Sequence, residues 1–167
     1  MQASQLYALL DSLDECKAGT KRAMVKLARK QPSFELLTTF PGVADVLASG
    51  YIAILMTPHR FSRRNKLWRY ASLGNVRHLS DGVLYKKGHS RTGNRALKWV
   101  VTQQFQAAVL RPGTKKNRFG RKYLSLVASG VSRSVARRQV CRNILSSIRA
   151  AWAKGEAYQD EVIITAQ

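Results

Sequence analysis

Acidic residues are scarce in this chain. Its 167 residues include nine aspartates and glutamates against 29 lysines and arginines, which gives a formal net charge of +20. Between Val46 and Gly155 there are 23 lysines and arginines and a single acid, Asp81. A tract this one-sided repels itself unless a polyanion lies against it, and nucleic acid is the commonest cellular polyanion. The shortage also excludes, within this tract, the carboxylate cluster that holds the metal ions of a two-metal nuclease.

Cysteines and long apolar runs are scarce as well. Cys16 and Cys141 are the only cysteines, and they fit neither a disulfide framework nor a zinc site. Because Cys141 falls on an apolar helical stripe, we expect it to be buried as a small hydrophobic residue. No apolar run reaches membrane-spanning length, and the N-terminus carries acids where a signal peptide carries bases. We therefore expect a cytoplasmic, nucleoid-associated protein without membrane contact.

The remaining apolar residues recur at three- and four-residue steps, which predicts a mainly α-helical fold. The expected helices cover 4–30, 34–40, 46–56, 61–73, 94–110, 122–128 and 132–154. We expect three parts: an amphipathic, coiled-coil-like helix over 1–31, a helical domain over 32–158 and an acidic tail over 159–167. The first helix can pack on its own domain or pair with a partner, and the tail can fold back on the basic surface or be disordered.

A tight turn separates two of the expected helices. Pro41, Gly42, Val43 and Ala44 form this turn, and an apolar run follows it, which is typical of a helix-hairpin-helix. Such a turn exposes backbone N–H groups at a helix N-terminus, where they can hold a phosphate without reading bases. An ordinary helical hairpin is the alternative interpretation.

Residues 74–93 have little helical period and four glycines, so we expect a loop-rich insertion, with a strand possible at 83–85. Ser80 and Ser90 lie in this insertion among basic residues that could stabilise a phosphoryl transition state. His78 or Asp81 could assist proton transfer. The alternative is that these serines form turns or donate hydrogen bonds to phosphates. No metal-ligand spacing is present, and we expect no metal site and no cofactor in this chain.

The order of three segments resembles the C-terminal transposase domain of the insertion-sequence 110/116/902 family, relatives of the Piv and MooV invertases. The segments are FPGVADVLASGYIAIL, HRFSRRNKLWRYASLGNVRHLSDG and KKGHSRTGNRALKWVV, and the resemblance extends over about 34–158. In the family, a serine of this domain attacks DNA and works with an acidic, Mg²⁺-binding RuvC-like domain. The resemblance implies Ser80 as this serine, with Ser90 as the alternative, and it implies a structured guide RNA and a homo-oligomer formed through the N-terminal helix.

We expect two departures from the family pattern, namely that no RuvC-like domain precedes residue 1 and that Ala44 replaces a hairpin glycine. We therefore expect the DNA-binding C-terminal part of a serine-dependent transposase, inactive in recombination on its own. The alternatives are a non-catalytic DNA- or RNA-binding remnant and a ribosome-associated basic protein. The expected DNA contacts are Pro41, Gly42, Val43, Ala44, Arg63, Arg64, Arg69, Arg77, Lys86, Lys87, Arg91, Asn94, Arg95, Lys115, Lys116, Arg137 and Arg138.

Overall fold

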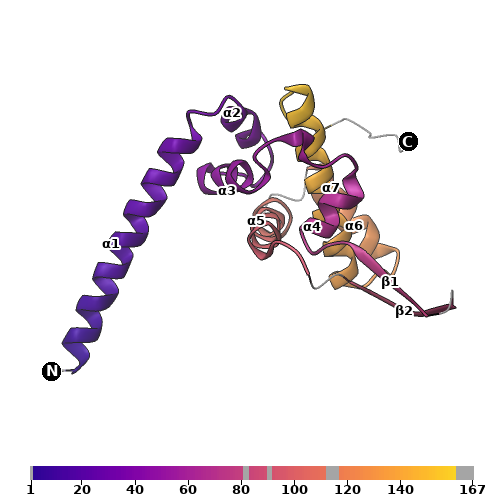
Figure 1. Ribbon diagram of the computed structural model, residues 1–167, viewed down its shortest axis with the longest axis horizontal. Helices are drawn as coiled ribbons and strands as arrows, with labels where there is room; N and C mark the ends of the chain where they lie inside the picture. The colour runs from indigo at the N-terminus through magenta and orange to yellow at the C-terminus, as the bar shows by residue number, and fades with distance from the viewer. Residues whose placement is uncertain (1, 81–82, 90–91, 112–116, 161–167) are drawn as a thin grey trace.

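The computed structural model describes residues 2–80, 83–89, 92–111 and 117–160 of the chain, and these residues are mainly helical (Figure 1). The elements, in chain order, are α1 (Gln2–Ala28), α2 (Ser33–Thr38), α3 (Asp45–Leu55), the 3₁₀-helix η1 (Pro58–Arg60), α4 (Arg64–Tyr70), β1 (Asn75–Ser80), β2 (Val83–His89), α5 (Arg95–Phe105), the π-helix η2 (Gln106–Leu110), α6 (Arg118–Ala128) and α7 (Arg133–Lys154). No helix among the described residues is long and apolar enough to cross a bilayer.

The long helix α1 contacts the other helices only near its C-terminal end, and its first half extends away from them (Figure 1). Ala28 is buried and Val25 packs against the core, close to α3. In the first half, the apolar side chains of Leu6, Tyr7, Leu9, Leu10 and Leu13 are exposed. The second half of this helix therefore packs on its own chain, which was one of the two alternatives. The first half has an apolar face with no partner among the described residues, and its pairing with another chain stays a prediction.

The core lies where α3, α5 and α7 meet. In the helix expected over 94–110, the apolar spacing predicts an inner face at Leu97, Val100, Val101, Phe105 and Val109. This face is confirmed, because all five are buried, four in α5 and Val109 in η2. The apolar spacing of the last helix predicts an inner stripe at Cys141, Ile144, Leu145, Ile148 and Trp152; the first four are buried in α7, and Trp152 is half-buried. Burial raises the pKa of the Cys141 thiol to about 12, so this cysteine is an inert core residue, as its place in the pattern predicts.

The Pro41–Ala44 turn between α2 and α3 is fixed by a buried polar network. Gln104 of α5 donates from Nε2 to the Pro41 carbonyl at 3.1 Å, and its Oε1 accepts from the Tyr51 hydroxyl at 2.6 Å. Gly42 has φ +75°, and a Cβ there would lie 2.8 Å from the Ala108 backbone nitrogen. Only glycine permits both this conformation and this approach. The turn is thus pressed on one side against the junction of α5 and η2.

The segment that we expected to be loop-rich instead carries a two-stranded antiparallel hairpin, β1–β2, which extends away from the helices (Figure 1). The expected strand at 83–85 is confirmed, because it lies within β2. The register shifts between His78 and Leu79, since His78 pairs with Lys86 and Leu79 with Leu84. This bulge breaks the two-residue alternation that marks a strand in a sequence, which is why the pattern did not predict the full hairpin.

Two helix boundaries also differ from the expected ones. The expected helix over 61–73 is shorter, because η1 and an extended stretch precede α4 and the helix ends at Tyr70. The expected helix 122–128 begins earlier, at Arg118, because Asn117 caps it: Asn117 Oδ1 accepts from the backbone nitrogens of Phe119 and Gly120, each at 3.0 Å. The division into three parts at 31 and 158 stays a prediction.

Candidate nucleic-acid interface

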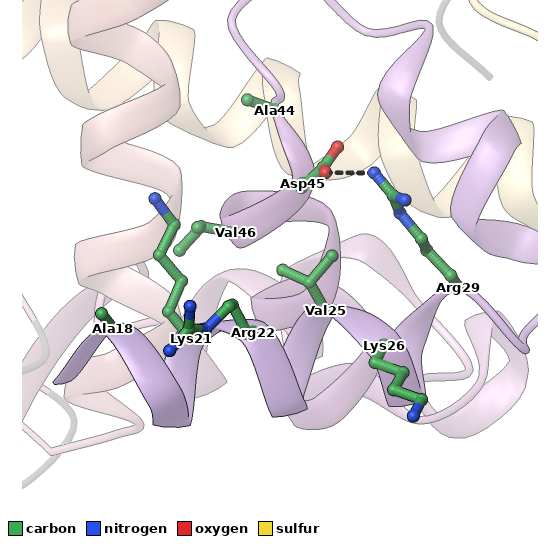
Figure 2. Close-up of a pocket in the computed structure, with 9 residues that line it drawn as sticks. All are labelled: Ala18, Lys21, Arg22, Val25, Lys26, Arg29, Ala44, Asp45 and Val46. Atoms are coloured by element: carbon green, nitrogen blue, oxygen red, sulfur yellow. Dashed lines mark hydrogen bonds and ion pairs between the residues drawn. The ribbon is translucent and has the colours of Figure 1, made fainter. Parts of the chain in front are cut away.

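A basic groove lies between α1 and the start of α3, with a volume of about 860 Å³. Three of its basic residues come from the second half of α1, the fourth, Arg29, directly follows that helix, and apolar residues of both segments complete the lining. The lining residues are Ala18, Lys21, Arg22, Val25, Lys26, Arg29, Ala44, Asp45 and Val46. Figure 2 shows Lys21 extending toward Val46, whereas Lys26 points away from the start of α3. Arg29 forms an ion pair with Asp45, 2.7 Å between Nη2 and Oδ2.

The N-terminus of α3 opens into this groove. Ala44 is the N-cap residue, it is extended (φ −106°, ψ 176°), and no side chain caps the helix. The first hydrogen bonds of the helix run from Leu47 and Ala48 to the Ala44 carbonyl, so the N–H groups of Asp45 and Val46 have no partner among the described residues. Unpaired N–H groups at a helix N-terminus carry partial positive charge and attract anions.

The four residues predicted to bind phosphate at this turn therefore differ in position. Ala44 is exposed at the groove, whereas Val43 is buried in the core and Pro41 and Gly42 are half-buried against α5. Pro41 and Gly42 thus shape the turn, and Ala44 with the first residues of α3 faces outward. The asymmetry follows from Gln104, because the side of the turn that it bonds cannot also face solvent.

The predicted basic contacts on the helices are spread over several elements. Exposed side chains are found at Arg63, Arg64, Arg69, Arg95 and Arg137, and half-buried ones at Arg138 and Asn94. Asn94 has a structural position: its Oδ1 accepts from the Leu97 backbone nitrogen at 2.8 Å, which caps α5, and its Nδ2 lies 3.0 Å from the Tyr70 hydroxyl. The structure thus places these bases on α4, α5 and α7 and does not bring them to a single point.

The remaining predicted site residues fall in or beside the hairpin and the basic loop. Ser80 is the last residue of β1 and stands opposite Val83 in the register, one step past the bulge. Arg77, Lys86 and Lys87 lie on the two strands, and their side chains, like that of Ser80, are outside the described part. The other predicted residues are wholly outside the described residues; they are Ser90, Arg91, Lys115 and Lys116.

Several arginines serve as internal supports, which the sequence pattern did not indicate. Arg142 donates from Nε to the Leu73 carbonyl and from Nη2 to Asn75 Oδ1, both at 2.6 Å, and its guanidinium lies 5.6 Å from the centre of the Trp68 ring. Burial, with a smaller effect from Arg138, lowers the pKa of Arg142. Arg142 therefore ties α7 to the end of α4 and to the first residue of the hairpin.

Two further arginines hold the chain around η1. Arg149 donates from Nε to the Phe61 carbonyl at 3.0 Å. Arg60 donates to the Ile54 carbonyl at 2.8 Å, and its guanidinium lies 4.8 Å from the centre of the Tyr70 ring. Helical periodicity in the sequence predicts that Arg142 and Arg149 lie on an outer, basic face of α7, but α4 and the segment before it cover that flank.

A second groove, of about 610 Å³, lies on the other side of the Pro41–Ala44 turn. The residues that line it come from the turn, the first half of α3, α5 and η2; they are Gly42, Ala44, Leu47, Trp99, Gln103, Gln106, Ala107, Leu110 and Arg111. Trp99 is 54% exposed and Leu110 is 50% exposed. The sequence contains a signal for the exposure of Trp99, because a residue two positions from each of the core residues Leu97 and Val101 lies on a different face of the helix.

The described part of the tail is folded onto α6. Asp160 accepts from the Arg118 backbone nitrogen (2.8 Å) and the Tyr158 hydroxyl (2.6 Å), and its Oδ2 lies 2.9 Å from Arg121 Nη2. Burial would raise the pKa of Asp160, but these hydrogen bonds and the Arg121 charge outweigh it and hold the pKa below its usual value. The Tyr158 ring contacts Phe40, with the ring centres 5.0 Å apart. Of the tail expected over 159–167, the structure describes only the first two residues, so its two alternatives, folding back and disorder, stay predictions for the rest.

The described residues contain no group of three or more His, Cys, Asp or Glu side chains that could hold a metal ion. The carboxylates in this part of the chain are separated, since Asp45 pairs with Arg29 and Asp160 with Arg121. They therefore do not form the oxygen-rich site that Mg²⁺ requires.

The described residues thus form a helical domain with a projecting hairpin, a tightly packed turn and basic residues on several faces. The family model described as "Transposase IS116/IS110/IS902 family" matches residues 34–124, and the chain belongs to this family. It is also 27% identical over 139 residues to the "Insertion element IS116 uncharacterized 44.8 kDa protein" of Streptomyces clavuligerus. That alignment covers 83% of this chain and 34% of the relative, so the chain spans about a third of the relative's length.

Proposed function

We propose that this chain is the DNA-binding C-terminal part of a serine-dependent insertion-sequence transposase. Membership of the family supports a role connected with transposition. The observation that carries the DNA-binding part is the basic groove, which Lys21 and Arg22 of α1 line together with the uncapped N-terminus of α3 (Figure 2). Backbone N–H groups and flexible cations in one groove suit a phosphate, and they fix the register of a duplex without reading its sequence.

The groove also explains how the α2–α3 hairpin acts as a helix-hairpin-helix. Gln104 and Gly42 hold the turn rigidly on its buried side, so the direction of α3, and of its N–H groups, does not depend on DNA. The exposed bases of α4, α5 and α7 extend the surface over which a backbone can be followed. Such a surface predicts binding that tolerates sequence changes.

We propose Ser80 as the nucleophile, with Ser90 as the alternative. In this proposal the Ser80 hydroxyl oxygen attacks a backbone phosphorus, and the bond from that phosphorus to one deoxyribose oxygen breaks. The serine proton passes to a neighbouring proton acceptor of the protein or to water, and the released strand end takes up a proton. The other strand end remains linked to Ser80 as a phosphodiester. The bulge next to Ser80 is of the kind that redirects side chains near active sites.

The reaction needs partners beyond the described residues. We propose that Mg²⁺ is bound by the acidic domain that the resemblance implies, because no carboxylate cluster forms here. The exposed leucines in the first half of α1 are placed to pair with a second copy in a coiled coil, which would bring two Ser80 residues into one complex. A structured RNA is the third proposed partner, and the spread of the basic surface suits it.

The second candidate function is a nucleic-acid-binding protein without catalysis. The observation that favours it is the same absence of a carboxylate cluster among the described residues. The two functions share the groove and differ in whether Ser80 ever becomes covalently linked to DNA.

Two measurements test the proposal. Titration of a labelled duplex should give an affinity that falls roughly a hundredfold or more between 50 and 200 mM salt, since each phosphate contact releases counterions. An affinity indifferent to salt would contradict DNA binding through the groove. With the acidic domain supplied on a separate polypeptide, the wild-type chain and Ser90→Ala should form a covalent protein–DNA adduct on a denaturing gel, and Ser80→Ala should not. Adducts from Ser80→Ala but not from Ser90→Ala would move the nucleophile to Ser90, and no adduct from any of the three would favour the second function.

A further inference from the structure

The function proposed above assigns no ligand to the groove that Trp99 lines. Two of the residues that line it, Trp99 and Leu110, are large apolar side chains. Trp99 and Leu110 present about half of their surfaces to solvent, although both lie next to fully buried residues of α5 and η2. An exposed tryptophan beside a groove is typical of a binding surface rather than of a core.

We propose that this groove binds an unpaired nucleobase of a single-stranded nucleic acid, with Trp99 as the stacking platform. The proposal rests on the proposed function, because it assumes that the chain binds nucleic acid. Every base has a π-face, so stacking on an exposed aromatic ring is the usual way in which a protein holds unpaired bases without regard to sequence.

The position of the groove relative to the basic one supports this occupant over a protein. Ala44 lines both grooves, so they meet at the Pro41–Ala44 turn. One side of the turn presents the lysines and arginines of α1 and the N-terminus of α3, and the other side presents the Trp99 ring. In a nucleotide, the charged phosphate and the flat base are neighbouring groups. At this turn, a basic groove and an apolar groove are neighbours in the same way, because Ala44 lines both.

The lining of the groove adds polar groups that suit base edges. Gln103 and Gln106 line it together with apolar Leu47 and Ala107, and a side-chain amide can donate and accept at once. Gln106 begins the π-helix η2, and π-helical turns are frequent at functional sites. The volume of about 610 Å³ lies within the range of roughly 300–1,000 Å³ that small-ligand sites occupy.

The test compares single-stranded oligothymidine with a duplex of the same length, using the full chain. Trp99→Ala should weaken binding of the single strand roughly tenfold and leave duplex binding within about twofold of wild type. Trp99→Phe should restore most of the single-strand affinity, because a ring remains. Leu124→Ala is the matched control, since Leu124 is also an exposed apolar residue but lies on α6 and does not line the groove.

Fluorescence gives an independent readout. Of the three tryptophans, Trp68 and Trp152 are half-buried, so quenching on addition of oligothymidine should come mainly from Trp99 and disappear in Trp99→Phe although binding persists. Failure of the wild-type chain to bind either nucleic acid would sink the proposed function. Normal duplex binding with single-strand binding unchanged in Trp99→Ala would overturn the base site alone. A shift of Trp99→Ala to a smaller oligomer, with single-strand binding intact, would instead make the groove an interface between copies and also overturn it.

Discussion

The flank of α7 that faces α4 and the groove between α1 and α3 are both rich in bases, but they use them in opposite ways. On α7, Arg142 and Arg149 donate to backbone carbonyls of Leu73 and Phe61 and are half-buried. In the groove, Lys21 and Arg22 are exposed and lie beside a helix N-terminus with unpaired N–H groups. The comparison teaches that a net charge of +20 is not by itself a measure of the nucleic-acid surface, because part of that charge supports the fold.

Removal of Arg142 should break this distinction most clearly. Arg142→Gln should lower the free energy of unfolding by about 2–3 kcal/mol, because the buried Leu73 carbonyl and Asn75 lose charged hydrogen bonds. Urea denaturation measures this loss, and hydrogen exchange should also speed up at the start of β1. Arg133→Gln, on an exposed residue at the start of α7, should change the free energy by less than about 0.5 kcal/mol. Equal effects of the two substitutions would show that Arg142 is not a support.

Ser72 tests the same junction between α4 and α7, because it directly precedes Leu73, whose carbonyl accepts from Arg142. Ser72 has φ +54°, it is 6% exposed, and its hydroxyl has no hydrogen-bond partner among the described residues. Ser72→Gly should raise the free energy of unfolding by about 1 kcal/mol, since relief of the left-handed strain and of the buried hydroxyl exceeds the extra freedom of glycine in the unfolded chain. Thermal denaturation checks the direction, and Ser62→Gly, at an exposed position, is expected to show no gain.

Arg121 is intermediate between the two classes, since it is exposed yet paired with Asp160. The pKa of Asp160 is lower in the folded chain than in the unfolded one, so its contribution to stability is present above about pH 4 and is lost as the pH falls through the folded pKa. The difference in free energy of unfolding between wild type and Asp160→Asn should be below about 1 kcal/mol at pH 6, because the pair is partly exposed, and should shrink as the pH falls and Asp160 becomes protonated in the folded chain. A difference that grows on acidification would show that folding raises the pKa of Asp160 and would contradict this prediction.

The sequence predicts the helices and their buried faces well, and it predicts the hairpin and the outer faces poorly. The core side of α5 follows from spacing, because Leu97, Val101 and Phe105 can only meet on one face. The bulge at His78–Leu79 hides the strand alternation. The basic run around Asn117 hides the start of the helix that this residue caps. The candidate site divides in the same way. The Pro41–Ala44 turn was predicted, but the contribution of α1 to its groove depends on a contact between distant segments, which periodicity does not encode.

The arginines of α7 show most directly why the sequence predicts the outer faces of helices poorly. A helical pattern tells which face is apolar, and it carries no information on whether a neighbouring helix covers the polar flank. Arg142 reaches a carbonyl 69 positions away in sequence, and its partner is a backbone atom that any residue type would supply. Trp99 is the converse case, because an apolar residue off the core face marks a surface and not a packing position.

The most direct test of the central claim is the slope of the logarithm of duplex affinity against the logarithm of salt concentration, compared between two charge-matched double variants. Lys21→Gln with Arg22→Gln removes two exposed bases of the groove, and Lys17→Gln with Lys154→Gln removes two exposed bases that each lie 3.6 Å from an acid outside it. Each lost phosphate contact should reduce the steepness by about 0.9, so we predict a reduction of up to about 1.8 for the groove pair and almost none for the control pair. Equal slopes for the two variants would contradict the assignment of the nucleic-acid surface to this groove.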